Sequence, residues 1–385
     1  MNLNKKALGV AAAVAVMSGS AFAVSPYGNT NQKGSLLIFP LIDITGTRNT
    51  LIRITNDFSA TVSLKCFYQT SDPSDYRKKY RNDFTFDLTK TQPGHWWAKS
   101  GSSTGETRLP QRVRAFSPLT AAGPAGADGT VGYIKADRGE LKCWAVDEER
   151  GTQISHNHLV GSATILDTES GQAFEYNAFA FQALPINGTR GTPVSTPGRL
   201  VLNGTPGNYD QVPKAALGNF TPVSGGFSGP EPGSIRSGNW AYVFLAGGRQ
   251  DLRQGGPAVV TKYAFTFWNQ DESGYTGEHV CGDSWVERSL GDFQSATYRL
   301  LRTDSAYYRI ESVGDKRICG DDAETVGMMG VQVQGETRVE HGVEPEQIYG
   351  ADVFVRGVAL HGRGSTSGLI TYDPPETDGG GPPNN

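Results

Sequence analysis

The sequence predicts a mainly β protein built from two β-sandwich domains of the Ig-like type. Short runs alternate between apolar and polar residues, as at 61–69, where Val62, Leu64 and Cys66 share one face. The 385 residues include 49 glycines and 21 prolines, which supply the frequent turns that many short strands require. Sandwich domains also place cysteine pairs on facing strands, and the chain has four cysteines. These observations favour sandwiches over a helical fold.

The first 23 residues have the pattern of a cleavable signal peptide. Lys5 and Lys6 supply positive charge, residues 7–17 form a short apolar core, and Ala21-Phe22-Ala23 has the small-x-small pattern that precedes a cleavage site. An apolar stretch this short does not span a bilayer, which takes about 20 residues. We therefore expect cleavage after Ala23 and export to the periplasm or the cell exterior, with no membrane span in the mature chain.

Residues 24–184 are expected to form the first sandwich domain. Its strands are predicted from runs rich in apolar, β-branched and aromatic residues that end at Gly, Asn or Asp. The predicted strands cover residues 35–42, 50–56, 61–69, 83–89, 130–135, 140–146, 158–166 and 173–181. Trp144 directly follows Cys143, so on a strand these two side chains point to opposite faces.

Residues 185–239 differ in composition, because Gly, Pro, Thr, Ser and Asn dominate there. Only a short strand at 199–202 and a brief helix at 212–217 are suggested. A structureless stretch of this length is unusual inside one compact domain. The segment is therefore interpreted as a Gly/Pro-rich connection between two domains.

Residues 240–373 are expected to form the second sandwich domain, followed by a disordered Pro/Gly-rich tail at 374–385. Apolar residues at helical spacing predict a helix at 283–301. Strands are predicted at 240–245, 258–268, 306–312, 326–334 and 369–372.

The two halves of the chain contain similar segments in a similar order. A strand that ends near Asn56 precedes Cys66, and a strand that ends at Asn269 precedes Cys281. Residues 161–167 and 364–370 form a second pair of similar segments. A duplication explains these echoes, and so does chance, because any strand–turn–strand unit has this pattern.

The four cysteines all lie in the exported part, where an even number favours disulfides. Four cysteines allow three pairings. Each half of the chain contains two, so Cys66–Cys143 with Cys281–Cys319 is the economical choice.

Two segments carry a resemblance to known proteins. Lys33-Gly34-Ser35-Leu36-Leu37-Ile38-Phe39-Pro40, with the strands that follow it, resembles the opening of a group of exported bacterial β proteins of uncharacterised function. Residues 267–272, followed by Cys281 and Trp285, are similar to a block in the same group. The resemblance covers about a quarter of the chain. It implies export and a β architecture, and it transfers no active site.

Charge and motifs argue against several classes of function. With 35 basic and 39 acidic residues and no basic stripe, the chain does not have the composition of a nucleic-acid-binding protein. The nucleotide-binding patterns GxxxxGK[ST] and GxGxxG are absent, and no cofactor is expected. Gly-x-Ser-x-Gly occurs at 101–105, but Pro110 follows too soon for the helix that a nucleophile elbow needs. No catalytic constellation emerges, which favours a non-catalytic protein over an enzyme.

Two pairs of side chains are candidate site residues. His156 and His158 lie on one side of an extended chain at a spacing that metals can use, but no third ligand is assignable and two polar residues entering a strand explain them as well. Trp96 and Trp97 are adjacent on a predicted strand, so one can face the core while the other stacks on a sugar or docks a partner.

The leading hypothesis is therefore a secreted, non-catalytic structural or interaction protein of the cell envelope or exterior, with an envelope protein or polysaccharide as partner. The alternative is a carbohydrate- or surface-binding module that uses Trp96 or Trp97. A third is a secreted hydrolase whose carboxylates meet only in three dimensions.

Overall fold

The fold is described from a computed structural model. It describes residues 27–72, 75–99, 113–114, 137–147, 151–223, 235–253, 256–341 and 348–373. The predicted signal peptide, the predicted tail, the Gly-x-Ser-x-Gly match and the strand predicted at 130–135 lie outside these residues.

The described strands form five sheets, numbered here for reference. Every strand pair is antiparallel except β14–β22. Sheet 1 contains β10 (Phe179–Phe181), β1 (Leu36–Asp43), β7 (Arg138–Val146), β3 (Val62–Asp72), β4 (Asp75–Leu88) and β6 (Val113–Arg114). Sheet 2 contains β5 (Pro93–Trp97), β2 (Arg48–Asn56), β8 (Leu159–Asp167) and β9 (Ala173–Asn177). Sheet 3 contains β11 (Arg199–Leu202), β22 (Gly368–Thr371) and β14 (Arg249–Asp251). Sheet 4 contains β17 (Trp285–Ser289), β13 (Ile235–Gly247), β19 (Met328–His341) and β20 (Ile348–Ala359). Sheet 5 contains β16 (Gly274–Asp283), β15 (Val260–Trp268), β18 (Ala306–Val313), β12 (Val212–Phe220) and β21 (His361–Thr366).

The prediction of two Ig-like β-sandwiches is wrong, although the mainly β character is confirmed. The five small sheets correspond in number, and roughly in size, to the blades of a five-bladed β-propeller. Sheet 4 shows why the prediction failed. A sandwich sheet is covered on one face, whereas β13 is apolar on both: Val243 and Leu245 pack toward sheet 5, and Phe244 packs toward sheets 1 and 2.

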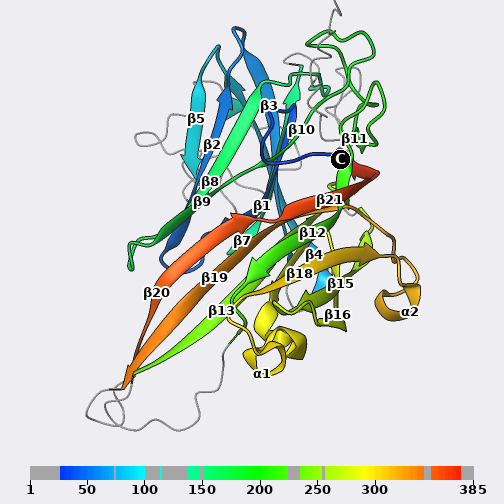
Figure 1. The fold of residues 1–385 in the computed structure, drawn as a ribbon. Helices are drawn as coiled ribbons and strands as arrows, with labels where there is room; N and C mark the ends of the chain where they lie inside the picture. Colours follow the sequence, from blue (N-terminus) through cyan, green and yellow to red (C-terminus); the bar gives the residue numbers. More distant parts are fainter. Residues whose placement is uncertain are drawn as a thin grey trace, which may run out of the picture.

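Three main clusters of buried side chains hold the sheets together. The first lies between sheets 1 and 2 and includes Phe39 and Trp96, together with Phe244 and Trp285 from sheet 4. The third lies between sheets 4 and 5 and includes Phe265. In Figure 1 the strands of sheet 2 stand in the upper part of the molecule, and β20, β19, β13 and β12 run side by side through the lower part. The first cluster thus combines residues from both predicted domains, that is, residues that precede the segment 185–239 in the sequence and residues that follow it.

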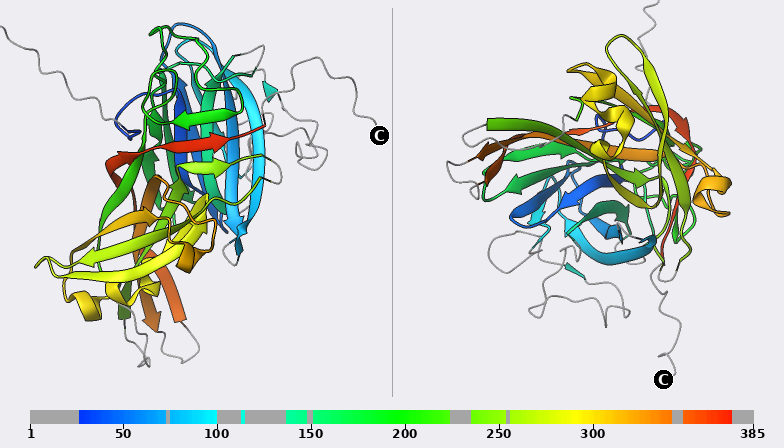
Figure 2. Two further views of the ribbon diagram at one scale, coloured as in Figure 1. Left: turned by 90° about the vertical axis from the view of Figure 1, so that its right-hand side faces the viewer. Right: turned by 90° about the horizontal axis from the view of Figure 1, so that it is seen from below.

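The second cluster lies on the other face of sheet 1, where sheet 3 covers it. Leu36, Trp144 and Phe67 of sheet 1 meet Leu200 and Ile370 of sheet 3 there. Figure 2 (left) shows the three short strands of sheet 3 lying across the long strands of sheet 1. Cys143 belongs to the first cluster and Trp144 to the second, so their predicted opposite orientation is confirmed.

Two predicted helices are strands or turns instead. Residues 283–301 contain β17, two 3-10 turns at Leu290–Asp292 and Gln294–Ala296, and the four-residue helix α1 (Tyr298–Leu301). Residues 212–217 lie in β12, inside sheet 5 between β18 and β21. The other helix, α2, spans Lys316–Cys319. The described part of the chain contains no helix long and apolar enough to cross a membrane.

The sequence echoes do not correspond to a structural repeat. β15 and β16, which flank Asn269, pair directly as a hairpin in sheet 5. Their counterparts β2 and β3 lie in different sheets. Residues 161–167 lie within β8, whereas residues 364–370 span the end of β21 and most of β22, in two sheets.

Candidate functional site

Trp96 is part of the core and cannot stack on a ligand from solution. Its side chain is 0% exposed, and its indole Nε1 donates a hydrogen bond to the Tyr68 hydroxyl at 2.8 Å. Phe84 and Phe86 contact its ring edge-on. Trp97 follows on β5, an edge strand, and is half-buried.

His156 and His158 have separate protein partners. His156 is buried, and its Nε2 lies 2.9 Å from Asn56 Oδ1. Burial, then the neighbouring His158 and Arg190, lower the pKa of His156 to about 4, so its ring is neutral at pH 7. His158 is half-buried, with Nδ1 3.1 Å from Asp57 Oδ1. Among the described residues, no group of three or more His, Cys, Asp or Glu side chains could hold a metal ion.

Both disulfides predicted by pairing the two cysteines within each half of the chain are present, Cys66–Cys143 and Cys281–Cys319. Cys66 and Cys143 oppose each other on the adjacent strands β3 and β7. Cys281 on β16 is bridged to Cys319 on α2, so its thiol is not available as a metal ligand beside His279.

The most distinctive exposed group lies on the outer face of sheet 5. On β15 and β18, alternate residues such as Phe267 and Tyr308 face the buried cluster, so Trp268, Tyr307 and Arg309 face outward. These three side chains define what we call the aromatic–arginine patch. The antiparallel register places Trp268 directly opposite Tyr307. A sheet whose inner face is buried thus presents the patch on its outer face.

The three side chains of the patch contact one another. The Trp268 and Tyr307 rings are stacked, with centroids 5.6 Å apart and planes 15° apart. The Arg309 guanidinium lies over the Trp268 ring, 5.8 Å from its centroid. Tyr307 is 39% exposed. Asn219 on β12 opposes Tyr307 on its other side and is exposed.

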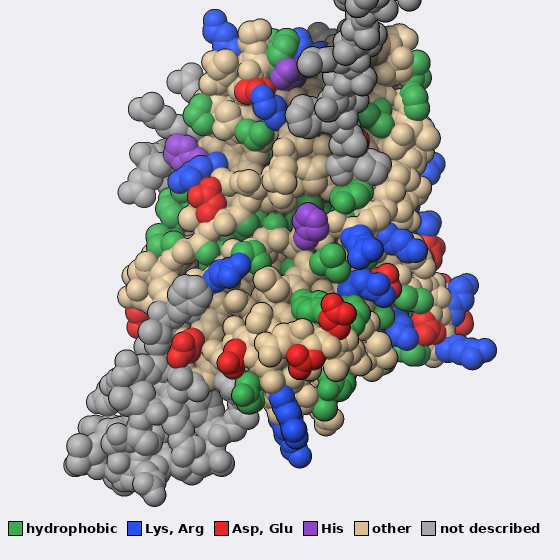
Figure 3. All heavy atoms as spheres, in the orientation of Figure 1, with side chains coloured by type: hydrophobic (Ala, Val, Ile, Leu, Met, Phe, Trp, Pro, Cys, Tyr) green, Lys and Arg blue, Asp and Glu red, His purple; other side chains and the backbone are tan. Residues whose placement is uncertain are grey.

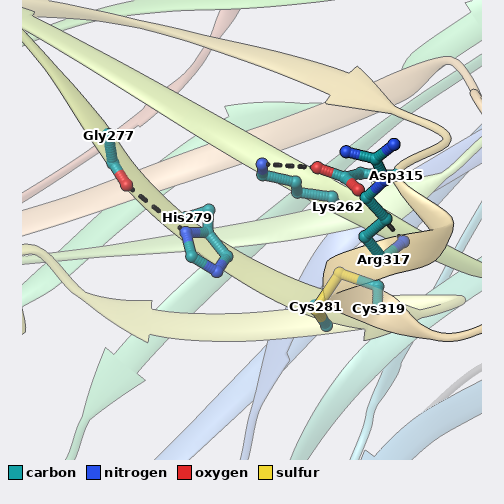
Figure 4. Close-up of a disulfide and its surroundings, with 7 residues drawn as sticks. All are labelled: Lys262, Gly277, His279, Cys281, Asp315, Arg317 and Cys319. Atoms are coloured by element: carbon teal, nitrogen blue, oxygen red, sulfur yellow. Dashed lines mark hydrogen bonds and ion pairs between the residues drawn. A yellow bond between two sulfur atoms is a disulfide. The ribbon is translucent and has the colours of Figure 1, made fainter.

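The edge of the same face is shaped by the second disulfide. The Cys281–Cys319 bridge ties α2 to β16, and Lys262 Nζ forms an ion pair with Asp315 Oδ2 at 2.9 Å beside it (Figure 4). The carboxylate of Asp315 also accepts the backbone N–H of Arg317. The hydrogen bond and charge of Lys262 lower the pKa of Asp315. In Figure 3, Lys and Arg side chains gather on this lower right part of the molecule, with acidic side chains among them.

The patch was not predicted from the sequence, although the sequence contains part of its signal. Residues 260–268 alternate strongly, which predicts that every second side chain faces solvent, and Trp268 falls on the polar side of that alternation. The sequence therefore indicates a tryptophan on the polar side of a strand. The pairing of this tryptophan with Tyr307 depends on strand register, which the sequence does not indicate.

Comparison with protein-family models and with curated proteins finds no match for this chain. The site therefore has to be interpreted from its own chemistry. Stacked rings, a guanidinium that is ion-paired with Glu311 and neighbouring hydrogen-bonding groups supply contact area and hydrogen bonds, which is the chemistry of recognition.

Proposed function

We propose that this chain is an exported, non-catalytic interaction protein of the cell envelope or exterior, and that it binds its partner through the aromatic–arginine patch. The observation that carries the proposal is the stacked Trp268–Tyr307 pair on the outer face of sheet 5, in which Tyr307 is exposed, Trp268 is half-buried and Arg309 lies over the Trp268 ring. Trp, Tyr and Arg are the residue types that contribute most to binding energy at protein interfaces. They stand here on strands whose other face is core, so the patch is preorganised.

Export is supported by two independent features. The N-terminal pattern is that of a cleavable signal peptide. All four cysteines are in disulfides, which persist in oxidising compartments and are rare in the cytosol.

A polysaccharide is the second candidate partner, because aromatic rings stack on sugar rings while neighbouring polar groups bond their hydroxyls. Asn219 opposes Tyr307, and Thr266 opposes Arg309, so neutral hydrogen-bonding groups adjoin the patch. For this candidate the stacking role moves to Trp268 and Tyr307, because Trp96 is buried.

The test compares the mature protein with Trp268→Ala and Tyr307→Ala on two probes. The first probe is the detergent-solubilised protein fraction of the producing cell's envelope, and the second is the protease-treated polysaccharide fraction of the same envelope. We expect retention on one probe and a loss of roughly tenfold or more in each variant. Tyr298→Ala is the matched control, since Tyr298 is 48% exposed but lies on α1, outside the patch.

The two fractions distinguish the two candidate partners. Retention of the mature protein on the polysaccharide fraction alone identifies a polysaccharide as the partner. Equal retention of all variants on either fraction would show that the patch does not bind, and absence of retention on both would overturn the proposal.

A further inference from the structure

A charged group is completely enclosed where sheet 3 covers sheet 1. Lys142 and Glu140 on β7 are both 0% exposed, and Gln250 on β14 is 1% exposed. Charged side chains are almost never fully buried without a partner, because removing an ion from water costs several kcal/mol. Here a lysine, a carboxyl group and a carboxamide meet in a dry space between two sheets.

One oxygen atom joins the three side chains. Lys142 Nζ lies 2.5 Å from Glu140 Oε1, and Gln250 Nε2 donates a hydrogen bond to the same Oε1 at 2.9 Å. The lysine nitrogen and the amide nitrogen are thus both within proton-transfer distance of a single carboxyl oxygen.

The amide of Gln250 is held in one orientation. Its Nε2 also lies within hydrogen-bonding distance of the Gly247 and Ser284 carbonyl oxygens, at 2.8 and 2.9 Å. Reversing the amide would turn its oxygen toward three acceptors. In this orientation, Gln250 Oε1 and Glu140 Oε2 are buried without a hydrogen-bond partner among the described residues. Such unsatisfied atoms are uncommon, and they leave the carbonyl of Gln250 unshielded by donors.

The surroundings favour the neutral form of Glu140. Burial raises the pKa of Glu140, and the nearby charge of Asp283 raises it further, against the opposing effect of Lys142. Moving the proton from Lys142 Nζ to Glu140 converts two buried charges into a neutral amine and a neutral carboxylic acid. A neutral, desolvated lysine is a nucleophile.

We propose that Lys142 and Gln250 become joined by an intramolecular isopeptide bond, with Glu140 as the proton-transfer group. The neutral Nζ of Lys142 attacks Cδ of Gln250 and forms the new C–N bond. Glu140, which has taken a proton from Nζ, delivers it to Nε2 as the Cδ–Nε2 bond breaks and ammonia leaves. Glu140 then takes the second proton that Nζ gives up as it becomes an amide nitrogen, so Glu140 ends in its neutral form. One amide replaces another, so no oxidant, reductant or further reactant is required.

The bond would tie β7 of sheet 1 to β14 of sheet 3. The two disulfides do not make this connection, because one lies within sheet 1 and the other joins β16 to α2. Unlike a disulfide, an amide bond also survives reduction.

Intact mass spectrometry of the reduced, mature protein tests the inference. We expect a mass lower than that of the sequence by one ammonia, and a protease digest that contains a branched peptide joining Lys142 to Gln250. Glu140→Gln keeps the shape of the proton-transfer group without its acidity, and Lys142→Met keeps the length of the nucleophile; each should restore the full mass. Lys262→Met is the matched control and should keep the mass deficit, because that lysine is ion-paired with Asp315 on sheet 5.

A wild-type protein with the full sequence mass would overturn the inference, and this result does not depend on any variant folding. Ammonia loss without the branched peptide would overturn it as well. A branch at Gln69, which opposes Glu140 in register, would show that the assigned partner is wrong.

Discussion

The two disulfides of this protein are chemically identical, but they differ in how deeply they are buried and in where they lie in their sheets. Cys66–Cys143 joins adjacent strands in the middle of sheet 1, and both cysteines are completely buried in the first cluster. Cys281–Cys319 lies at the margin of sheet 5, where Cys319 is buried in a small cluster, Cys281 is half-buried and the neighbouring His279 is exposed. The first belongs to the core and the second to the edge of a surface.

The comparison shows that a disulfide can have different consequences for structure. β3 and β7 are already held by a ladder of paired residues, so the first disulfide reinforces an existing arrangement. α2 has only four residues, too few to be stable alone. The second disulfide therefore sets where α2 sits, and with it the edge of the outer face of sheet 5.

Removing the disulfides separately should give the largest effect and the sharpest test of this contrast. Chain entropy alone predicts a loss of about 4.5 kcal/mol for the bridge with sequence separation 77 and about 4 kcal/mol for that with separation 38. The first pair should cost more than this difference suggests, because Cys66→Ala with Cys143→Ala leaves a cavity at two completely buried positions, whereas Cys281 of the other pair is half-buried. Urea unfolding of the two double variants measures both losses. A larger loss for Cys281→Ala with Cys319→Ala would break the contrast.

Trp96 and Trp97 show the same contrast in burial between two adjacent side chains. Trp96→Ala should lower the free energy of unfolding by about 3–5 kcal/mol, because it removes a buried ring and the hydrogen bond to Tyr68. Trp97→Ala, one residue away and half-buried, should cost about 1 kcal/mol. Thermal unfolding of the pair, each a control for the other, checks this. Equal losses would show that burial does not separate them.

The sequence predicted the local features of this fold well, but it predicted poorly which strands pair with one another. The alternation at 61–69 correctly gave a strand with Cys66 facing the core, and chain economy gave both disulfides. Strand partners depend on contacts between distant residues, which periodicity does not encode. β2 and β3 read as one strand–turn–strand unit, yet they pair in different sheets.

The same limit applies to the candidate site. The outward position of Trp268 follows from alternation along β15, but its stacking on Tyr307 requires β18 to pair with β15 in one particular register. The Lys142–Glu140–Gln250 group was equally hidden. Glu140 and Lys142 alternate on a strand as surface residues do, and only the covering by sheet 3 makes them buried.

His156 provides a pH-dependent test of the buried region. Its pKa is about 4 in the folded protein, below the ordinary value of 6.5, so protonation favours the unfolded chain. The stabilising effect is fully present above pH 6.5 and is lost as the pH falls from 6.5 toward 4. The difference corresponds to roughly 3 kcal/mol. His156→Gln should flatten the pH dependence of the unfolding midpoint across this window. A variant with the same slope as the wild type would show that the histidine is not kept neutral by the fold.

The smallest expected effect on stability is at the aromatic–arginine patch. Tyr307→Ala removes the exposed ring of the stacked pair, so the free energy of unfolding should fall by only about 0.5–1 kcal/mol. Chemical unfolding, measured beside Trp96→Ala, checks this. The contrast matters for the proposed function, since a residue selected for binding adds little to folding, whereas Trp96 should do the opposite. If Tyr307→Ala instead destabilised the protein as much as Trp96→Ala, the pair would be a structural part of sheet 5, and any loss of binding in that variant would reflect unfolding.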